Sequence, residues 1–142
     1  MVDSDDVVSP DLFATLYAAA QQSGAGLVIC NGCQMLPDGT TRKLPEEQRF
    51  EKDNDPDGNL SSGMPSIRRG SVSSPGTAHR LYAARLFEGV RYPVGMLHED
   101  YYVLPDLIAR CGKIQCLAYT GYYVRQHEGS ITRQAAMNCA WR

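Results

Sequence analysis

The sequence has no extended block of basic residues and no long hydrophobic run. Its 14 Lys and Arg are outnumbered by 16 Asp and Glu, which gives a formal net charge of −2 over 142 residues. This balance excludes a strongly basic nucleic-acid-binding protein and a polybasic membrane anchor. No apolar run approaches the ~20 residues that a membrane-spanning helix needs, and the acidic start at 1–6 lacks the basic and apolar regions of a signal peptide. We therefore expect one cytoplasmic domain, or part of one, with no nucleic-acid partner and no transmembrane segment.

The sequence has five cysteines, an odd number. A disulfide-stabilised secreted domain has a denser and even set, which favours reduced thiols. Cys30 and Cys33 have the CxxC spacing of a zinc site, to which Cys111 and Cys116 could add ligands. The favoured interpretation is that the thiols pack as small apolar side chains, because Cys30 ends one apolar run and Cys116 lies within another. The five cysteines are at positions 30, 33, 111, 116 and 139.

The pattern of apolar and turn-forming residues predicts an α/β chain in which helices and strands alternate. The first helix is expected to open at Ser9, with Pro10 in its first turn, and to stop at Gly24. Pro105 predicts a kink or a restart in a later helix. The predicted helices are 9–24, 78–87, 99–110 and 133–141. One strand is predicted over 26–35, and one or two strands over 113–124. The glycine-, serine- and proline-rich segment 41–77 is predicted to be a long polar loop.

Three segments carry side chains that could do chemistry, and the first is Asp3-Ser4-Asp5-Asp6. Two carboxylates separated by one residue, at the end of a strand, can present oxygens to one divalent cation. Mg²⁺ or Mn²⁺ prefers one or two carboxylates, with phosphates and water completing the shell. A solvated acidic terminus is the alternative interpretation.

The second segment is His98-Glu99-Asp100, at the start of the predicted helix 99–110. One of its carboxylates could act as a general base while the other orients it. Favourable interaction with the helix dipole is the alternative.

The third segment, 122–132, follows the last predicted strand. Guanidinium groups bind phosphate oxygens and neutral imidazole binds divalent metals, so Arg125 and His127 are candidates for these roles. Ser130 and Thr132 could add hydroxyl contacts. A polar surface loop is again the alternative. Arg68 and Arg69, in the polar loop 41–77, could contact an acceptor or a phosphate, although a solvated position is the simpler interpretation.

These three segments, in this order, resemble the second half of a family 2 glycosyltransferase of the GT-A fold. The resemblance covers almost the whole of 1–142 outside the polar loop. Its further motifs are Ser9-Pro10-Asp11, Gly26-Leu27-Val28, Pro37-Asp38-Gly39, Leu81-Tyr82, Leu86-Phe87 and Tyr92-Pro93-Val94-Gly95.

The resemblance implies roles for particular residues. In such enzymes the DxD segment holds a divalent cation, Mn²⁺ or Mg²⁺, on the diphosphate of a nucleotide-sugar. The matching positions are Asp5 and Asp3, with His127 on the metal side. Arg125 is expected to contact the diphosphate, together with Ser130 and Thr132.

The resemblance also implies an inverting reaction. Asp100 matches the catalytic base of these enzymes, and Glu99 is expected to help place the acceptor. The base takes a proton from an acceptor hydroxyl, which then displaces the nucleoside diphosphate from the sugar. The expected partners are a nucleotide-sugar donor and a glycan or glycolipid acceptor, which suggests polysaccharide biosynthesis in the cytoplasm or at the inner membrane surface.

Compared with this family, the N-terminal nucleotide-binding half does not precede Asp3. We therefore expect 1–142 to be a single partial GT-A domain, on the acceptor and metal side of the enzyme. Such a fragment is expected to be inactive alone and to have an exposed sheet edge through which it could self-associate.

Two other interpretations remain open. One is a non-catalytic module, derived from such an enzyme, that binds a glycan or a protein partner. The other is a phosphatase of the haloacid dehalogenase type, because 3–7 fits the motif Asp-x-Asp-x-(Thr/Val). In that class the first carboxylate attacks phosphorus and a downstream lysine assists, for which Lys113 is the late lysine in the sequence.

Overall fold

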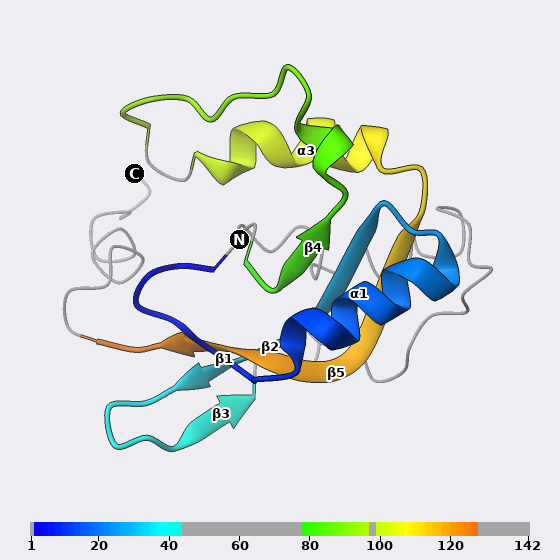
Figure 1. Ribbon diagram of the computed structural model, residues 1–142. Coiled ribbons are helices and arrows are strands. Elements are labelled where there is room, and N and C mark those ends of the chain that lie inside the picture. The colour runs from blue at the N-terminus through cyan, green and yellow to red at the C-terminus, as the bar shows by residue number, and fades with distance from the viewer. Residues whose placement is uncertain (1, 44–77, 97–98, 128–142) are drawn as a thin grey trace, which may run out of the picture.

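The computed structural model describes residues 2–43, 78–96 and 99–127 (Figure 1). Its helices pack on one mixed sheet, which confirms the predicted α/β class. In chain order they are β1 (Val7–Val8), α1 (Leu12–Ser23), β2 (Leu27–Met35), β3 (Thr41–Lys43), β4 (Arg80–Tyr82), the 3₁₀ helix η2 (Ala84–Phe87), α3 (Asp100–Arg110) and β5 (Ile114–Arg125).

One mixed sheet forms the centre of the molecule. β2 and β5 run parallel, with Leu27 opposite Ile114 at one end and Met35 opposite Arg125 at the other. β1 pairs antiparallel with β5, so the order is β1-β5-β2-β3. β3 and β4 both pair antiparallel with β2, at opposite ends of that strand.

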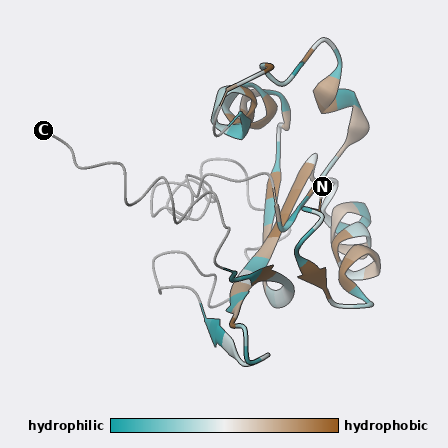
Figure 2. Ribbon diagram, turned by 90° about the vertical axis from the view of Figure 1, so that its left-hand side faces the viewer, coloured by the Kyte–Doolittle hydropathy of each residue, from teal (hydrophilic) through white to brown (hydrophobic). Residues whose placement is uncertain are grey.

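The two long helices cover opposite faces of this sheet, as Figure 2 shows. On one face, Leu12 and Leu16 of α1 pack in a buried cluster with Val28 of β2. On the other, Val103 and Leu107 of α3 pack in a second cluster on Leu27, Ile29, Ile114 and Cys116. Alternation along β2 therefore sends successive apolar side chains into separate cores. None of the helices in the described part of the chain is long and apolar enough to cross a membrane.

The first helix begins at Leu12, later than predicted. The Ser9 backbone is held beside β5 instead, because its N–H donates to the carbonyl of Gly121 at 2.9 Å. Asp11 is the N-cap residue but makes no side-chain capping hydrogen bond. Gly24 ends the helix in a left-handed conformation, with φ of 67°, as predicted.

The predicted helix 78–87 is wrong in its first half. Arg80–Tyr82 form β4, with Tyr82 opposite Leu27, and only Ala84–Phe87 are helical. The apolar pattern of this segment did not reveal that it pairs with β2, because β2 lies about fifty residues earlier in the chain. Similarly, the predicted loop 41–77 begins as the hairpin strand β3, and 44–77 lie outside the described residues.

α3 is one helix from Asp100 to Arg110 that includes Pro105, so it does not restart there. The proline lies on the exposed side of the helix, whereas Val103, Leu104 and Leu107 are buried. Burial of this apolar face compensates for the hydrogen bond that proline cannot donate. The last predicted helix, 133–141, lies outside the described residues.

The cysteines pack as the favoured interpretation predicts. Cys30, Cys33, Cys111 and Cys116 are all buried and unbridged, while Cys139 lies outside the described residues. Cys30 and Cys116 belong to the two different cores, on opposite faces of the sheet. Burial raises the pKa of the Cys30 thiol to about 11 and that of Cys116 to about 12, which keeps both protonated and unreactive at neutral pH.

Gly26 allows α3 and β2 to approach closely. A Cβ at this position would lie 2.5 Å from the carbonyl oxygen of Cys111, which is a backbone atom. We expect Gly26→Ala to lower the free energy of unfolding by up to about 3 kcal/mol, because the backbone must move to relieve the clash. Urea denaturation measures this loss. Gly39→Asn is the control, since Gly39 has a positive φ and open space, and should cost less than about 1 kcal/mol. Equal midpoints for the two variants would contradict the expectation.

Candidate metal and nucleotide-sugar site

The acidic segment at 3–6 forms a turn directly before β1 (Figure 1). The backbone N–H of Asp6 donates to the carbonyl of Asp3 at 3.2 Å, which closes the turn. The carboxylates were expected at the end of a strand. Instead, Val2 and Asp3 have irregular backbone, and the strand follows the acids.

Asp6 connects this turn to the end of β5 through hydrogen bonds. One carboxylate oxygen accepts the backbone N–H of Arg125 at 3.0 Å, and the other accepts the hydroxyl of Tyr122 at 2.7 Å. The same Tyr122 hydroxyl accepts the backbone N–H of Asp3 at 3.1 Å. Both oxygens of Asp6 are therefore engaged in holding the turn.

Asp5 lies against His127, beyond the end of β5. Its Oδ2 is 2.9 Å from the Nε2 of His127, and the two side chains are 54% and 43% exposed. The hydrogen bond from His127 lowers the pKa of Asp5, and the charges of His127 and Arg125 add to this effect. The structure thus brings Asp5 close to two other predicted site residues, Arg125 and His127, which follow it by 120 and 122 positions in the sequence.

Asp3 links the acidic turn to the start of α3. Partial burial of its carboxyl raises its pKa, and the negative charges of Asp6, Asp5, Asp100 and Glu99 raise it further. The predicted metal residue and the predicted base therefore belong to one region of negative potential. Crowded carboxylates of this kind favour a cation between them.

Two tyrosines that sequence reasoning missed complete the surroundings. Tyr122 is fully buried, yet its hydroxyl reaches the acidic turn. Tyr82 of β4 receives a hydrogen bond from Arg80 at 3.5 Å. Burial raises the pKa of Tyr82, and the charge of Asp100 contributes to that rise, so Tyr82 lies within electrostatic reach of the predicted base.

For the other predicted site residues the structure describes fewer contacts, or does not describe the residue. The backbone of Arg125 binds Asp6 while its side chain is exposed beside the turn. Glu99 is exposed and Asp100 half-buried at the start of α3. His98, Ser130, Thr132, Arg68 and Arg69 lie outside the described residues.

The metal-binding side chains near the acidic turn are few, and a divalent cation there would also need oxygen ligands from a substrate. Within 2–43, 78–96 and 99–127, no three His, Cys, Asp or Glu side chains are gathered into a protein-only metal site, and this includes the CxxC cysteines. Mg²⁺ and Mn²⁺ do not require such a cage, since one or two carboxylates suffice when phosphate oxygens fill the other positions. The carboxylates of Asp3 and Asp5 and the ring of His127 are the described groups of this region that could supply such a partial set.

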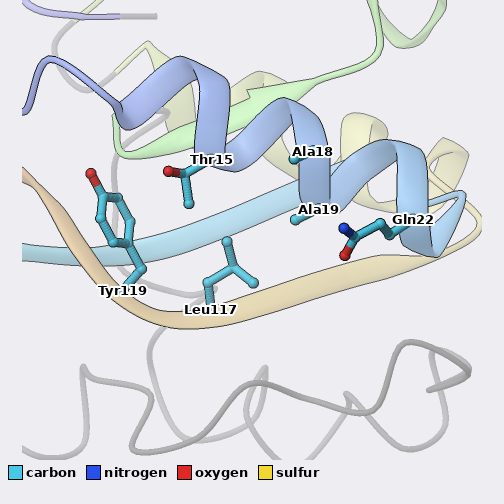
Figure 3. A pocket seen from close by; sticks show the side chains of 6 residues that line it. All are labelled: Thr15, Ala18, Ala19, Gln22, Leu117 and Tyr119. Carbon is cyan, nitrogen blue, oxygen red and sulfur yellow. The ribbon is translucent and has the colours of Figure 1, made fainter.

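A groove beside α1 is chemically different from this site. It lies between α1 and β5, has a volume of about 370 Å³, and is lined by Thr15, Ala18, Ala19, Gln22, Leu117 and Tyr119 (Figure 3). No charged side chain lines it. This groove has no group that would bind a metal or a diphosphate.

Comparisons with known proteins identify the fold. No family model and no curated protein sequence matches this chain. Among solved structures, S. aureus TarS 1–349 in complex with UDP-GlcNAc superposes on 91% of the chain with a TM-score of 0.68 and 17% identity. A second structure of TarS 1–349 superposes on 87% with a TM-score of 0.65 and 16% identity. In both cases the match covers 34% of the TarS chain, so this chain spans about a third of that length. The chain therefore has a glycosyltransferase-like fold, similar to that of part of TarS.

Proposed function

We propose that this chain is the metal and acceptor side of an inverting, family 2 glycosyltransferase that uses a nucleotide-sugar donor. The observation that carries the proposal is that the acidic turn contacts His127 through Asp5, while Asp3 of the same turn interacts electrostatically with Glu99 and Asp100. Its support from the comparisons is the fold that this chain shares with TarS, which binds UDP-GlcNAc.

In this proposal the acidic turn and the end of β5 receive the diphosphate. Asp5 and Asp3, with His127, would hold Mn²⁺ or Mg²⁺. Arg125 would contact the phosphate oxygens, and Ser130 and Thr132 would assist. When bound, the cation would offset the negative charge that develops on the departing diphosphate.

Asp100 would act as the general base at the acceptor hydroxyl. The proton moves to its carboxylate while the hydroxyl oxygen bonds to the anomeric carbon. The bond from that carbon to the diphosphate breaks, and its electron pair leaves with the nucleotide. Glu99, one residue before, would help to orient the acceptor. Because attack and departure occur on opposite sides, the configuration at the anomeric carbon inverts.

We propose a glycan or glycolipid as the acceptor, in bacterial polysaccharide assembly. Nucleotide-sugars are cytoplasmic donors, which would put the reaction in the cytoplasm or at the inner membrane surface.

Donor binding tests this proposal. UDP-GlcNAc serves as the probe, titrated calorimetrically into the protein with and without Mn²⁺. We expect Mn²⁺-dependent binding that Asp5→Asn weakens at least ~10-fold, since even partners outside the metal shell contribute 10–100-fold to metal affinity. Asp38→Asn is the matched control, because it removes the same charge from the exposed turn between β2 and β3.

Equal binding by wild type and Asp5→Asn would contradict the metal assignment. Metal-independent glycan binding that survives Asp5→Ala with Asp100→Ala would favour the non-catalytic module. Release of phosphate from a phosphomonoester, abolished by Asp3→Asn, would favour the phosphatase.

A further inference from the structure

The hydroxyl of Tyr122 joins two parts of the acidic turn. It accepts the backbone N–H of Asp3 at 3.1 Å and donates to the carboxylate of Asp6 at 2.7 Å. The ring is completely buried, so this polar group has been placed inside the core with both of its partners in the turn. A buried hydroxyl with two such bonds restricts the positions available to both residues.

The strand pairing fixes where this hydroxyl lies. Val8 of β1 is opposite Tyr122 of β5, and Val7 is opposite Tyr123. The Ser9 N–H adds a bond to the carbonyl of Gly121. On its other side the ring makes an edge contact with His79, with centroids 6.1 Å apart. Tyr122 is therefore held rigidly by elements that do not belong to the acidic turn.

The three aspartates of the turn therefore have different contacts. Asp6 uses one oxygen for Tyr122 and the other for the backbone of Arg125, which leaves it poorly suited to bind a cation. Asp3 is fixed through its backbone, so its carboxylate stays available. The side chain of Asp5 projects toward His127 and is largely exposed.

We propose that Tyr122 is a positioning residue, whose hydroxyl couples the Asp3 backbone to the Asp6 carboxylate and so presents Asp3 and Asp5 to a divalent cation. This assignment rests on the proposed function. It extends that function to a residue with no predicted role and to Asp6, which acts as an anchor rather than as a ligand.

Affinity for Mn²⁺ alone tests the assignment, measured by calorimetric titration of the whole chain with MnCl₂. We expect Tyr122→Phe to weaken binding ~10-fold or more, in the range found for partners outside the metal shell. Tyr123→Phe is the matched control, because the hydrogen bond that this neighbouring hydroxyl accepts within the described part of the chain is a long one, 3.4 Å from the Ser9 hydroxyl. It should bind Mn²⁺ as the wild type does.

Amide hydrogen exchange separates positioning from a general loss of stability. In Tyr122→Phe, the amides of Asp3 and Arg125 should exchange faster, whereas the amide of Cys116, in the core of β5, should keep its protection. If all three lose protection equally, Tyr122 acts only on the stability of the fold and the assignment is overturned.

A second variant covers the case in which Tyr122→Phe fails to fold. Asp6→Asn keeps the size of the anchor but weakens its two acceptor contacts, and it should also raise the Kd for Mn²⁺. Asp11→Asn removes an equal charge at the N-cap of α1, where the Asp11 carboxylate accepts the hydroxyl of Tyr119 rather than a group of the acidic turn, and should leave the Kd for Mn²⁺ unchanged.

The possible failures are distinguishable. If wild type binds Mn²⁺ and Asp5→Asn does not, but folded Tyr122→Phe and Asp6→Asn bind normally, the positioning role is overturned while the proposed function stands. If wild type does not bind Mn²⁺, the metal site and the positioning role are overturned together.

Discussion

Replacing Asp100 with Asn is expected to reduce sugar transfer by about 10²–10⁴-fold, the usual contribution of a general base. The amide has nearly the same shape as the carboxylate but does not accept a proton from the acceptor hydroxyl. Asp100 lies in the first turn of α3, where its charge influences both Asp3 and Tyr82. Loss of this charge should therefore change the chemical step much more than it changes the fold.

The measurement is the release of UDP in the full-length protein that the gene encodes, with UDP-GlcNAc as donor and Mn²⁺ present. Donor affinity should change only a few-fold, because Asp100 is not assigned to the diphosphate. Asp106→Asn provides the control on the same helix, since Asp106 is exposed and outside the site. If Asp100→Asn and Asp106→Asn release UDP equally fast, Asp100 is not the base.

Acidification is expected to destabilise the fold through His79. This residue precedes β4 with a positive φ of 50°, and its carbonyl accepts the N–H of Cys30 at 3.1 Å. Burial of the ring, with some help from the charge of Arg80, lowers its pKa from 6.5 to about 3. The folded chain therefore keeps the ring neutral at pH values where the unfolded chain has protonated it.

This difference in bound protons determines whether stability rises or falls with pH. Between pH 6.5 and about 3, the unfolded state binds one more proton than the folded state, so stability falls as pH falls. Each pH unit is worth about 1.4 kcal/mol, and a drop from pH 6.5 to 5 should cost about 2 kcal/mol. Above pH 6.5 both states are neutral at this residue, and the penalty disappears.

Urea denaturation at pH 7 and pH 5 measures the effect. His79→Asn is the informative variant, because asparagine tolerates a positive φ and does not titrate. The variant should lose less stability than the wild type does between these two pH values, by about 2 kcal/mol. An unchanged pH dependence would show that His79 is not the group responsible.

Local sequence patterns were sufficient for much of the fold. The apolar spacing of α1, its stop at Gly24, the buried strand β2 and the long strand β5 all follow from nearest neighbours in the chain. α3 was also predicted at its observed place, despite Pro105. The residues within each of these elements are therefore enough to predict whether it is a helix or a strand.

The misread elements depend on distant partners. β4 is a strand because it pairs with β2, and nothing within 78–87 specifies that partner. Ser9 does not begin α1 because its backbone is paired beyond the end of β1, with Gly121. Pairings between segments that lie far apart in the sequence are set by the packed fold and not by local propensity.

The candidate site shows the same division. The residue types of Asp3, Asp5, Asp100, Arg125 and His127 suggested their chemistry, and their roles stay predictions. The contact between Tyr122 and Asp6 spans 116 positions, and the sequence offered no signal for it. Residue type thus indicates which groups can act, whereas only the fold reveals which groups hold them in place.

We propose that the acidic turn, the start of α3 and the end of β5 form one cation and diphosphate site. Paramagnetic broadening by substoichiometric Mn²⁺, in the NMR spectrum of the ¹⁵N-labelled chain with UDP, distinguishes one site from several. We expect selective broadening of the amides of Asp3, Asp5, Asp100 and His127, while the amide of Asp38 in the β2–β3 turn stays sharp. Broadening centred elsewhere, or confined to the acidic turn without Asp100, would contradict a single site.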